Sequence, residues 1–313
     1  MASDAFETTL RAIAGPAAVR VKAPLAALTT FHVGGPADWL VEVRTIDQLV
    51  AVLQAARRGG LPITVLGGGS NVVVSDDGVR GVVVRLLLSS VSQPAPDRVR
   101  AEAGVTMNGL VRWTISRGLA GLEAWAGTPG TVGGAIYGNA HFAGRNIGDL
   151  VTDVGLVTPP GNLVTAPRAD MEFAYDTSRV KRTREVVVWA DFAATPGDPA
   201  VLRARARESL AYRKRTQPLA QPSAGCIFQN PDPAHDSVPV GVPASAGALV
   251  DRAGLKGHRI GGASISAAHA NFIVSDGHAT ARDIRALVEL ARSRVREQFG
   301  VELRDEVVFI GEF

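Results

Sequence analysis

The chain has 313 residues, of which 46% are hydrophobic and 20% charged, so it can bury a sizeable core and is not a disordered protein. Its net charge of +3 is too small to indicate a nucleic-acid-binding protein. No apolar run approaches the ~18–20 residues of a membrane span, and the first residues lack the basic and apolar blocks of a secretory signal. The single cysteine, Cys226, excludes an internal disulfide and a cysteine-based zinc site. We therefore expect a cytoplasmic protein without a nucleic-acid or membrane partner.

Strand and helix patterns follow one another along the chain and predict a mixed α/β fold. The predicted strands are short and rich in valine or isoleucine, at 62–66 (a buried strand), 81–88 and 185–190. The predicted helices lie at 46–58, 199–215, 246–253 and 280–299. Thr45 with Gln48, and Thr280 with Asp283, form capping boxes, and Gly300 ends the last helix. The composition changes near residue 196, which predicts a domain boundary there.

A first glycine cluster, LGGGSN at 66–71, directly follows the predicted strand at 62–66. Glycines allow backbone N–H groups to point at a phosphate without obstruction by a Cβ atom. The cluster is not a Walker A loop, since no Lys-Ser/Thr follows, and Val72 replaces the third glycine of a Rossmann fingerprint. A tight turn without a ligand explains this cluster alone equally well.

A second cluster, GTPGTVGG at 127–134, combines four glycines with a proline and two hydroxyl groups. Such a loop can surround a pyrophosphate with amides and hydroxyls, although an irregular loop between strands is the alternative. Two such clusters in one half of the chain favour a dinucleotide with a phosphate bridge. The candidate cofactor-binding residues are Gly67, Gly68, Gly69, Ser70, Asn71, Pro129, Gly130, Thr131, Gly133 and Gly134.

Six segments carry a resemblance to a known family, in the same order along residues 22–313. They are TTFHVGGPADWLVEV (29–43), VLGGGSNVVVSD (65–76), GTPGTVGGAIYGNA (127–140), QPLAQPSAGCIFQNP (217–231), AGLKGHRIGGASISAAHANFIV (253–274) and FGVELRDEVVFIGE (299–312). The sequence resembles the UDP-N-acetylenolpyruvoylglucosamine reductases, and its short stretch between Tyr175 and Asp198 resembles their type II branch.

The resemblance implies an α+β fold with two domains. The first is an FAD-binding domain of the vanillyl-alcohol-oxidase/PCMH type at 22–196, in two parts at 22–85 and 86–196. The second is a substrate-binding domain at 197–313. It also implies two small-molecule substrates, NADPH and a UDP-sugar, and a monomeric protein. No cluster of His, Asp, Glu or Cys residues has metal-ligand spacing in the sequence, so we expect no bound metal.

The resemblance further implies a reaction of peptidoglycan synthesis. NADPH reduces FAD, and the flavin passes hydride to the enolpyruvyl ether of UDP-N-acetylglucosamine enolpyruvate, giving UDP-N-acetylmuramate. Such a reaction needs a group that stabilises negative charge on the substrate carboxylate and a group that delivers a proton to the carbanion.

Cys226 and Glu306 are the candidates for this chemistry. Cys226 lies in AGCIFQNP (224–231), where the family motif usually has serine, and a thiol is more acidic than a hydroxyl. We expect it to be the proton donor, although a lone cysteine can also be a small buried hydrophobic residue. Glu306 matches the family's catalytic glutamate, with Glu302 and Asp305 as close alternatives in the sequence.

The expected catalytic arginine is where this chain departs from the family. The pattern Tyr-Arg-x-Ser has Asp176 at its second position, between Tyr175 and Ser178. We expect Arg179 to substitute for the missing arginine, and Asp176 to turn away and pair with Arg179 or Arg182. Further candidates for contact with the substrate are Arg213, Asn230 and Arg259.

Two other functions stay open. One is an FAD-dependent oxidase with the same cofactor domain, although such oxidases resemble only the N-terminal half of this chain. The other is a degenerate flavin-binding protein without turnover, which the unusual residues Asp176 and Cys226 suggest.

Overall fold

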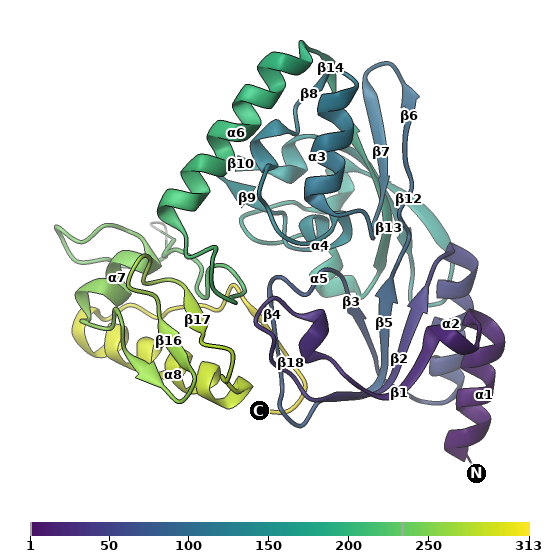
Figure 1. The fold of residues 1–313 in the computed structure, drawn as a ribbon, viewed down its shortest axis with the longest axis horizontal. Coiled ribbons are helices and arrows are strands. Elements are labelled where there is room, and N and C mark those ends of the chain that lie inside the picture. Colours follow the sequence, from purple (N-terminus) through teal and green to yellow (C-terminus); the bar gives the residue numbers. More distant parts are fainter. Residues whose placement is uncertain (1, 233–234) are drawn as a thin grey trace. The chain divides into compact units, whose positions relative to one another are not determined.

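The computed structural model describes residues 2–232 and 235–313, and it divides the chain into two compact units (Figure 1). The first unit comprises Met1–Ala23, Ala37–Gly68 and Arg80–Tyr212. The second comprises Pro24–Pro36, Gly69–Val79 and Arg213–Phe313. Each unit is built from three separate stretches of the chain, whereas the domains expected at 22–196 and 197–313 are each one continuous stretch. Those domain boundaries stay a prediction.

The first sheet of the first unit has four strands in the order β1 (Val19–Pro24), β2 (Pro36–Val43), β5 (Val79–Leu86) and β3 (Ile63–Leu66). Strands β3 and β5 are parallel and confirm the predicted strands at 62–66 and 81–88. The prediction that the strand at 62–66 is buried was wrong, because β3 is an edge strand and only Leu66 is buried in it.

Helices α1 (Ala2–Ala14) and α2 (Ile46–Arg58) lie side by side in this unit (Figure 1). The hydroxyl of Thr45 caps α2 by accepting a hydrogen bond from the Gln48 N–H. The side chain of Gln48 accepts from the N–H of Arg44 rather than from that of Thr45, so only half of the expected capping box forms. Helix α1 was not predicted.

The second sheet of the first unit is antiparallel, in the order β12 (Leu163–Pro167), β11 (Val151–Val157), β13 (Val186–Ala193), β7 (Arg98–Glu102) and β6 (Val91–Ala95). The central strand β13 confirms the prediction at 185–190 and is buried along nearly all its length. This explains the apolar run at Val186–Ala190, since alternation is expected only where one face meets water. Helix α4 (Val132–Tyr137) packs on β13 and β7.

Smaller elements complete this unit. Helix α3 spans Met107–Ser116 and helix α5 spans Val180–Thr183. Two short pairs of strands are formed by β8 (Leu119–Ala120) with β14 (Thr195–Pro196), and by β9 (His141–Phe142) with β10 (Arg145–Asn146). Single 3-10 turns occur at Pro16–Ala18, Glu123–Trp125, Ile147–Asp149 and Arg168–Met171, and a further one, at Ala26–Leu28, belongs to the second unit. Helix α6 (Pro199–Thr216) confirms the predicted helix at 199–215 and runs across the division between the units.

The second unit contains a three-stranded antiparallel sheet of β15 (Arg259–Ile260), β16 (Ala263–Ile265) and β17 (Ile273–Ser275). Helix α8 (Ala281–Phe299) packs on this sheet and on helix α7 (Ala246–Arg252). The capping box of Thr280 and Asp283 is present, and Gly300 ends α8 with a φ of +69°. Strand β18 (Val308–Ile310) runs parallel to β4 (Val72–Val74) and ties the end of the chain to the first glycine cluster. Helices with mainly antiparallel sheets in both units confirm the predicted α+β class.

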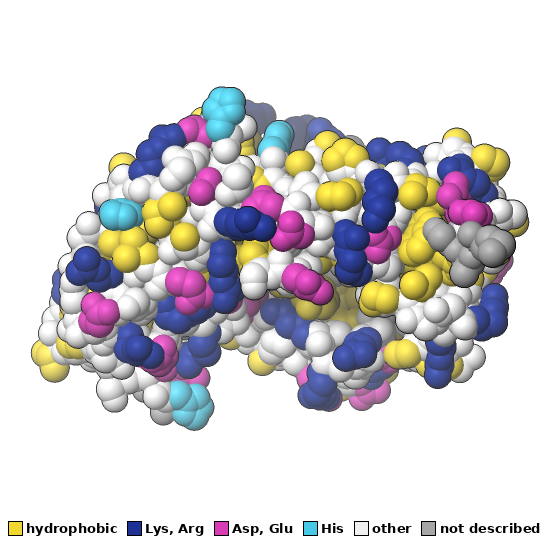
Figure 2. Space-filling view, turned by 90° about the horizontal axis from the view of Figure 1, so that it is seen from below, with side chains coloured by type: hydrophobic (Ala, Val, Ile, Leu, Met, Phe, Trp, Pro, Cys, Tyr) yellow, Lys and Arg dark blue, Asp and Glu magenta, His cyan; other side chains and the backbone are white. Residues whose placement is uncertain are grey.

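The charge pattern of the surface and the apolar length of the helices concern the expectation that the protein has no nucleic-acid or membrane partner. Figure 2 shows basic and acidic side chains interspersed among the described residues of one face, without a wide field of one sign there. Among the described residues, no helix is long and apolar enough to cross a membrane.

Candidate functional site

The two glycine clusters meet within the first unit. A Cβ atom on Gly68 would lie 2.7 Å from the Cα atom of Gly130, and one on Gly67 would lie 2.8 Å from Oγ1 of Thr131. Real Cβ atoms essentially never make contacts this short, so glycine is required where the clusters touch. The structure therefore brings together two clusters that lie more than sixty positions apart in the sequence.

The second cluster is held by the segment that leads into α3. The N–H of Met107 donates to the Gly130 carbonyl at 3.1 Å, and the N–H of Val132 donates to the Val105 carbonyl at 2.9 Å. The side chain of Asn108 accepts from the Gly127 N–H at 2.7 Å. Sequence reasoning missed this support, because Asn108 lies in an ordinary helical pattern nineteen residues before the glycine that it holds.

The second cluster is only in part a loop. Thr131 is the N-cap of α4, so Gly133 and Gly134 lie in its first turn and not in an open loop as expected. A Cβ atom on Gly133 would lie 3.1 Å from Cβ of Ala103, so this glycine allows α4 to pack closely on Ala103, the residue that follows β7. The residues outside α4 at which the two clusters touch are Gly67, Gly68, Gly130 and Thr131. We call these four residues the glycine cradle.

The hydroxyl of Thr131 marks the polar centre of this cradle. Thr131 is 8% exposed, and its Oγ1 has no hydrogen-bond partner among the described residues. Leaving a buried hydroxyl without a partner costs about 1–3 kcal/mol. Glycine backbones that admit close approach and a buried hydroxyl that needs a partner together fit a phosphate group of a dinucleotide.

The rest of the first cluster belongs to the second unit and connects to the C-terminal segment. Gly69 has a φ of +62° and lies against the carbonyl of Leu28, which leaves no space for a side chain. Two residues later, the Nδ2 atom of Asn71 donates to the Glu306 carbonyl at 3.0 Å. Ser70 lies between these two residues and is half-buried.

Cys226 and Glu306 come together in the second unit. The N–H of Glu306 donates at 2.8 Å to the carbonyl of Ile227, the residue after Cys226. With the bond from Asn71, this fixes the Glu306 backbone on both sides. Two hydrogen bonds thus link the predicted cofactor residue Asn71, the predicted catalytic residue Glu306 and the residue that follows Cys226.

A buried asparagine that sequence reasoning missed holds the Cys226 segment. Asn271 is 4% exposed, and its side chain accepts from the Phe228 N–H at 2.9 Å and donates to the Phe228 carbonyl at 2.8 Å. Its own carbonyl accepts from the Ile227 N–H at 2.8 Å, and Cys226 forms an antiparallel bridge with Phe272. These contacts fix the backbone of the segment that carries the half-buried cysteine.

The two acidic alternatives to Glu306 have other contacts. Asp305 accepts a hydrogen bond from Arg292 at 2.6 Å, and Glu302 forms an exposed ion pair with Arg296. Their positions favour Glu306 as the acidic residue beside Cys226.

Arg213 lies near Cys226 in the interior of the second unit. It is 6% exposed, and burial lowers the pKa of its guanidinium to about 10, against an opposing effect of the Cys226 side chain. The group therefore keeps its positive charge near neutral pH.

The other two predicted substrate residues have structural contacts of their own. The side chain of Asn230 accepts from the Ala246 N–H at 3.1 Å, at the beginning of α7. Arg259 is half-exposed on β15, donates to the Gly261 carbonyl and forms an ion pair with Asp276. Their contact with a substrate stays a prediction.

Arg179 belongs to the first unit, where Glu185 binds it. Its Nε and Nη2 atoms donate to the two Glu185 oxygens at 2.9 and 2.8 Å. Burial alone would raise the pKa of Glu185, but the hydrogen bonds from Arg179 and Thr183 outweigh it and hold this pKa below its usual value. The carboxylate that faces the guanidinium is thus one of the protein's own, and the predicted role of Arg179 toward the substrate stays a prediction.

The expected partner of Asp176 was wrong. Asp176 is 4% exposed and forms an ion pair with Lys181, whose Nζ atom lies 3.6 Å from its Oδ2. Arg182 is bound instead by Glu172, at 2.7 Å.

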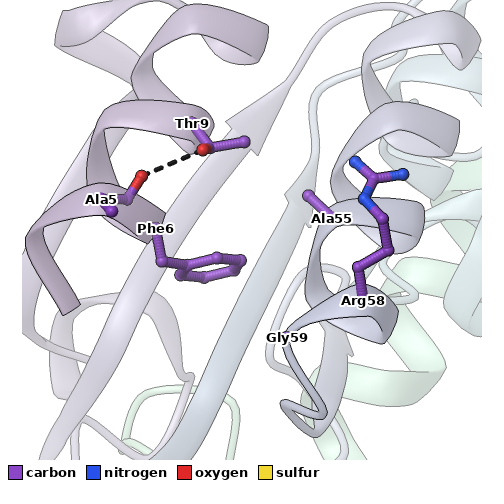
Figure 3. Close-up of a pocket in the computed structure, with 6 residues that line it drawn as sticks. All are labelled: Ala5, Phe6, Thr9, Ala55, Arg58 and Gly59. Atoms are coloured by element: carbon purple, nitrogen blue, oxygen red, sulfur yellow. Dashed lines mark hydrogen bonds between the residues drawn. The ribbon is translucent and has the colours of Figure 1, made fainter. Parts of the chain in front are cut away.

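Two surface cavities are lined by none of the predicted site residues. Figure 3 shows the first, a groove of about 280 Å³ between α1 and α2, lined by Ala5, Phe6, Thr9, Ala55, Arg58 and Gly59. The second, about 310 Å³, is lined by Ser75, Asp77, Arg282, Arg285, Ala286, Glu312 and Phe313. Within residues 2–232 and 235–313, no group of three or more His, Cys, Asp or Glu side chains could hold a metal ion.

Two family models match the chain. The model described as the FAD binding domain matches residues 37–167, and the C-terminal domain of UDP-N-acetylenolpyruvoylglucosamine reductase matches residues 217–310. The first match includes the glycine cradle, and the second includes Cys226 and Glu306.

Curated relatives and a solved structure match over nearly the full length. The UDP-N-acetylenolpyruvoylglucosamine reductase of Synechococcus sp. (strain WH7803) is 39% identical over 97% of this chain and 96% of its own. That of Anaeromyxobacter dehalogenans (strain 2CP-1) is 42% identical over 93% and 85%. The crystal structure of the Thermus caldophilus enzyme is 32% identical, has a TM-score of 0.77, and covers 94% of this chain and 98% of its own.

Proposed function

Because the chain belongs to the UDP-N-acetylenolpyruvoylglucosamine reductase family, we propose that it reduces UDP-N-acetylglucosamine enolpyruvate to UDP-N-acetylmuramate, with FAD as cofactor and NADPH as reductant. The observation that carries the proposal is the pair of hydrogen bonds linking Asn71, Glu306 and Ile227. It joins the glycine cluster to the residues suited to proton delivery. We also propose that the protein acts as a monomer in the cytoplasm.

The glycine cradle is the proposed phosphate-binding part of the FAD site. Gly67, Gly68 and Gly130 provide backbone without side chains, and the buried Thr131 hydroxyl provides a hydrogen-bond donor. Bound FAD would supply hydride transfer from NADPH to the terminal vinyl carbon of the substrate.

Cys226 delivers the proton that completes the reduction. Addition of hydride to the vinyl carbon leaves negative charge on the neighbouring carbon and its carboxylate, and this carbon takes a proton from the thiol. The thiolate that remains lies near the buried Arg213 guanidinium, which keeps its charge at neutral pH and stabilises an anion beside it. Arg213 therefore lowers the cost of proton delivery.

Glu306 orients the reacting group. Its backbone is fixed by Asn71 on one side and Ile227 on the other, so its side chain starts from a defined position next to the segment that carries Cys226. A carboxylate there can accept a hydrogen bond from the enol form of the substrate. Holding a catalytic side chain in position beside the reacting group of the substrate in this way speeds the reaction, because less freedom of motion has to be lost in the transition state.

An anaerobic titration of the purified protein tests the proposal. NADPH should bleach the flavin absorbance, and UDP-N-acetylglucosamine enolpyruvate should then restore it with one equivalent of UDP-N-acetylmuramate formed. A flavin that NADPH does not reduce would indicate a binding protein without turnover. A flavin that ignores NADPH but reacts rapidly with oxygen when reduced by a sugar or alcohol would indicate an oxidase.

A further inference from the structure

A buried acid-base pair at the end of α4 is unused by the mechanism above. Asp176 has a φ of +53° and its side chain is 5% exposed, whereas the side chain of Lys181 is 26% exposed. The lysine is therefore the outer member of the pair. An anion that approaches from solvent meets the ammonium group before it meets the carboxylate.

The ammonium group of Lys181 retains donors for a ligand. It donates one hydrogen bond, to the Asp176 carbonyl at 2.5 Å, and the Asp176 carboxylate at 3.6 Å is an ion-pair partner beyond hydrogen-bond distance. An ammonium group has three N–H donors. Among the described residues, the structure thus assigns it one hydrogen bond and leaves two donors.

The pair is attached to the helix that begins in the glycine cradle. The Ser178 hydroxyl donates to the Tyr137 carbonyl at 2.9 Å, and Lys181 Nζ lies 5.5 Å from the centre of the Tyr137 ring. Tyr137 ends α4, and Thr131 caps its beginning. Six residues of helix span about 9 Å, so the ammonium group lies one short helix away from the proposed cofactor cradle.

Tyr137 adds a second donor at the same place. Its side chain is partly exposed, and burial together with the charge of Asp176 raises the pKa of its phenol. The hydroxyl therefore stays protonated through the neutral range and can donate to an anion bound by Lys181.

Two other cations of the segment, Arg179 and Arg182, are already bound by carboxylates. Glu185 takes the guanidinium of Arg179 through two hydrogen bonds, and Glu172 takes that of Arg182 through two. A guanidinium that is matched at two points has little to offer a second carboxylate.

From these contacts we propose that Lys181 binds the carboxylate of the enolpyruvyl group, and that Asp176 positions it. The inference rests on the proposed function, which supplies a ligand with a carboxylate next to the reacting carbon. Lys181 would be the catalytic residue that meets the charge developing there, since its ammonium group lies beside Tyr137 at the end of α4 and retains donors.

Two ligands that differ in the carboxylate test the proposal. UDP-N-acetylmuramate carries it, and UDP-N-acetylglucosamine has the same nucleotide and sugar without it. In calorimetric titrations of the FAD-loaded protein, Lys181→Met should lower the affinity for UDP-N-acetylmuramate about tenfold to a hundredfold. This is the usual scale for one charge-assisted hydrogen bond. Binding of UDP-N-acetylglucosamine should be unchanged, as should both affinities in the matched control Arg182→Met.

Further variants separate binding from folding. Lys181→Met leaves Asp176 buried without its cation, so the double variant Lys181→Met/Asp176→Asn removes both charges and should show the same selective loss. Lys181→Arg should recover part of the lost affinity. Asp176→Asn keeps the hydrogen bond from Lys181 to the backbone carbonyl of residue 176. It should lower only the affinity for UDP-N-acetylmuramate, by about threefold.

The outcomes distinguish this inference from the proposed function. Equal weakening of both ligands would assign Lys181 to the diphosphate or to folding and overturn the inference, as would normal binding by the double variant. A selective loss in Arg179→Met instead would return the role to that arginine. A wild-type protein that binds neither ligand and does not turn over would overturn the proposed function and the inference with it.

Discussion

The contact between the glycine clusters, where Gly68 meets Gly130, and the charged segment at 172–185 both lie in the first unit but differ in how they are encoded. In the clusters the backbone itself carries the function, and Gly68 against Gly130 leaves no alternative residue. In the charged segment three acidic residues and three cations form three pairs, Arg179–Glu185, Lys181–Asp176 and Arg182–Glu172. The comparison shows that a steric requirement can be read from local sequence, whereas the choice among charge partners depends on the folded positions.

The largest expected effect is at the contact between the clusters. Gly68→Val should yield colourless protein without FAD, and Gly68→Ala should lose most of its flavin, because the new Cβ would lie 2.7 Å from Gly130 Cα. Flavin content is measured by the ratio of the visible absorbance of the flavin to the ultraviolet absorbance of the protein. Gly59→Ala is the matched control, since its Cβ finds only ordinary contacts of 3.5 Å or more. Full flavin occupancy in Gly68→Val would show that the cradle does not hold the cofactor.

Cys226 is the next test, because there a side chain carries the chemistry and a rigid backbone places it. Cys226→Ala should keep FAD and be reduced by NADPH at the wild-type rate, and should then be reoxidised by substrate about 10²–10⁴ times more slowly, as for a missing general acid. Stopped-flow absorbance separates the two half-reactions. Cys226→Ser restores a proton donor and should retain substantial activity. Reoxidation of the alanine variant at the wild-type rate would make Cys226 a packing residue.

The same distinction explains what could be predicted from the sequence. The capped helix α8 was predicted because Thr280, Asp283 and Gly300 each satisfy a local backbone requirement. Strand β13 was predicted because burial on both faces leaves an unbroken apolar run. The supports at Asn108 and Asn271 were missed, because each holds a segment distant in sequence and an asparagine carries no local pattern that marks such a contact.

The smallest expected effect is on stability, at the pair that Arg179 forms. The side chains of Arg179 and Glu185 are 20% and 9% exposed, so Arg179→Met leaves a nearly buried carboxylate without its cation. We expect this to cost about 2–3 kcal/mol of unfolding free energy and to lower the midpoint of thermal unfolding. Arg182→Met removes an exposed pair and should cost less than about 1 kcal/mol.

The pH dependence of this loss identifies its cause. Since the pKa of Glu185 is lower in the folded protein than its ordinary value of 4.5, its ion pair stabilises the fold above that pH, and the contribution disappears as the pH falls through the folded value. In Arg179→Met only the hydrogen bond from Thr183 still opposes the burial of the Glu185 charge, so protonation of Glu185 on acidification lowers the cost of burying it in the variant. The difference in unfolding midpoint between wild type and Arg179→Met should therefore be largest near pH 7 and shrink below about pH 4.5. A difference that stays constant from neutral to acidic pH would mean that the arginine stabilises the protein by packing its aliphatic stem rather than by pairing with Glu185.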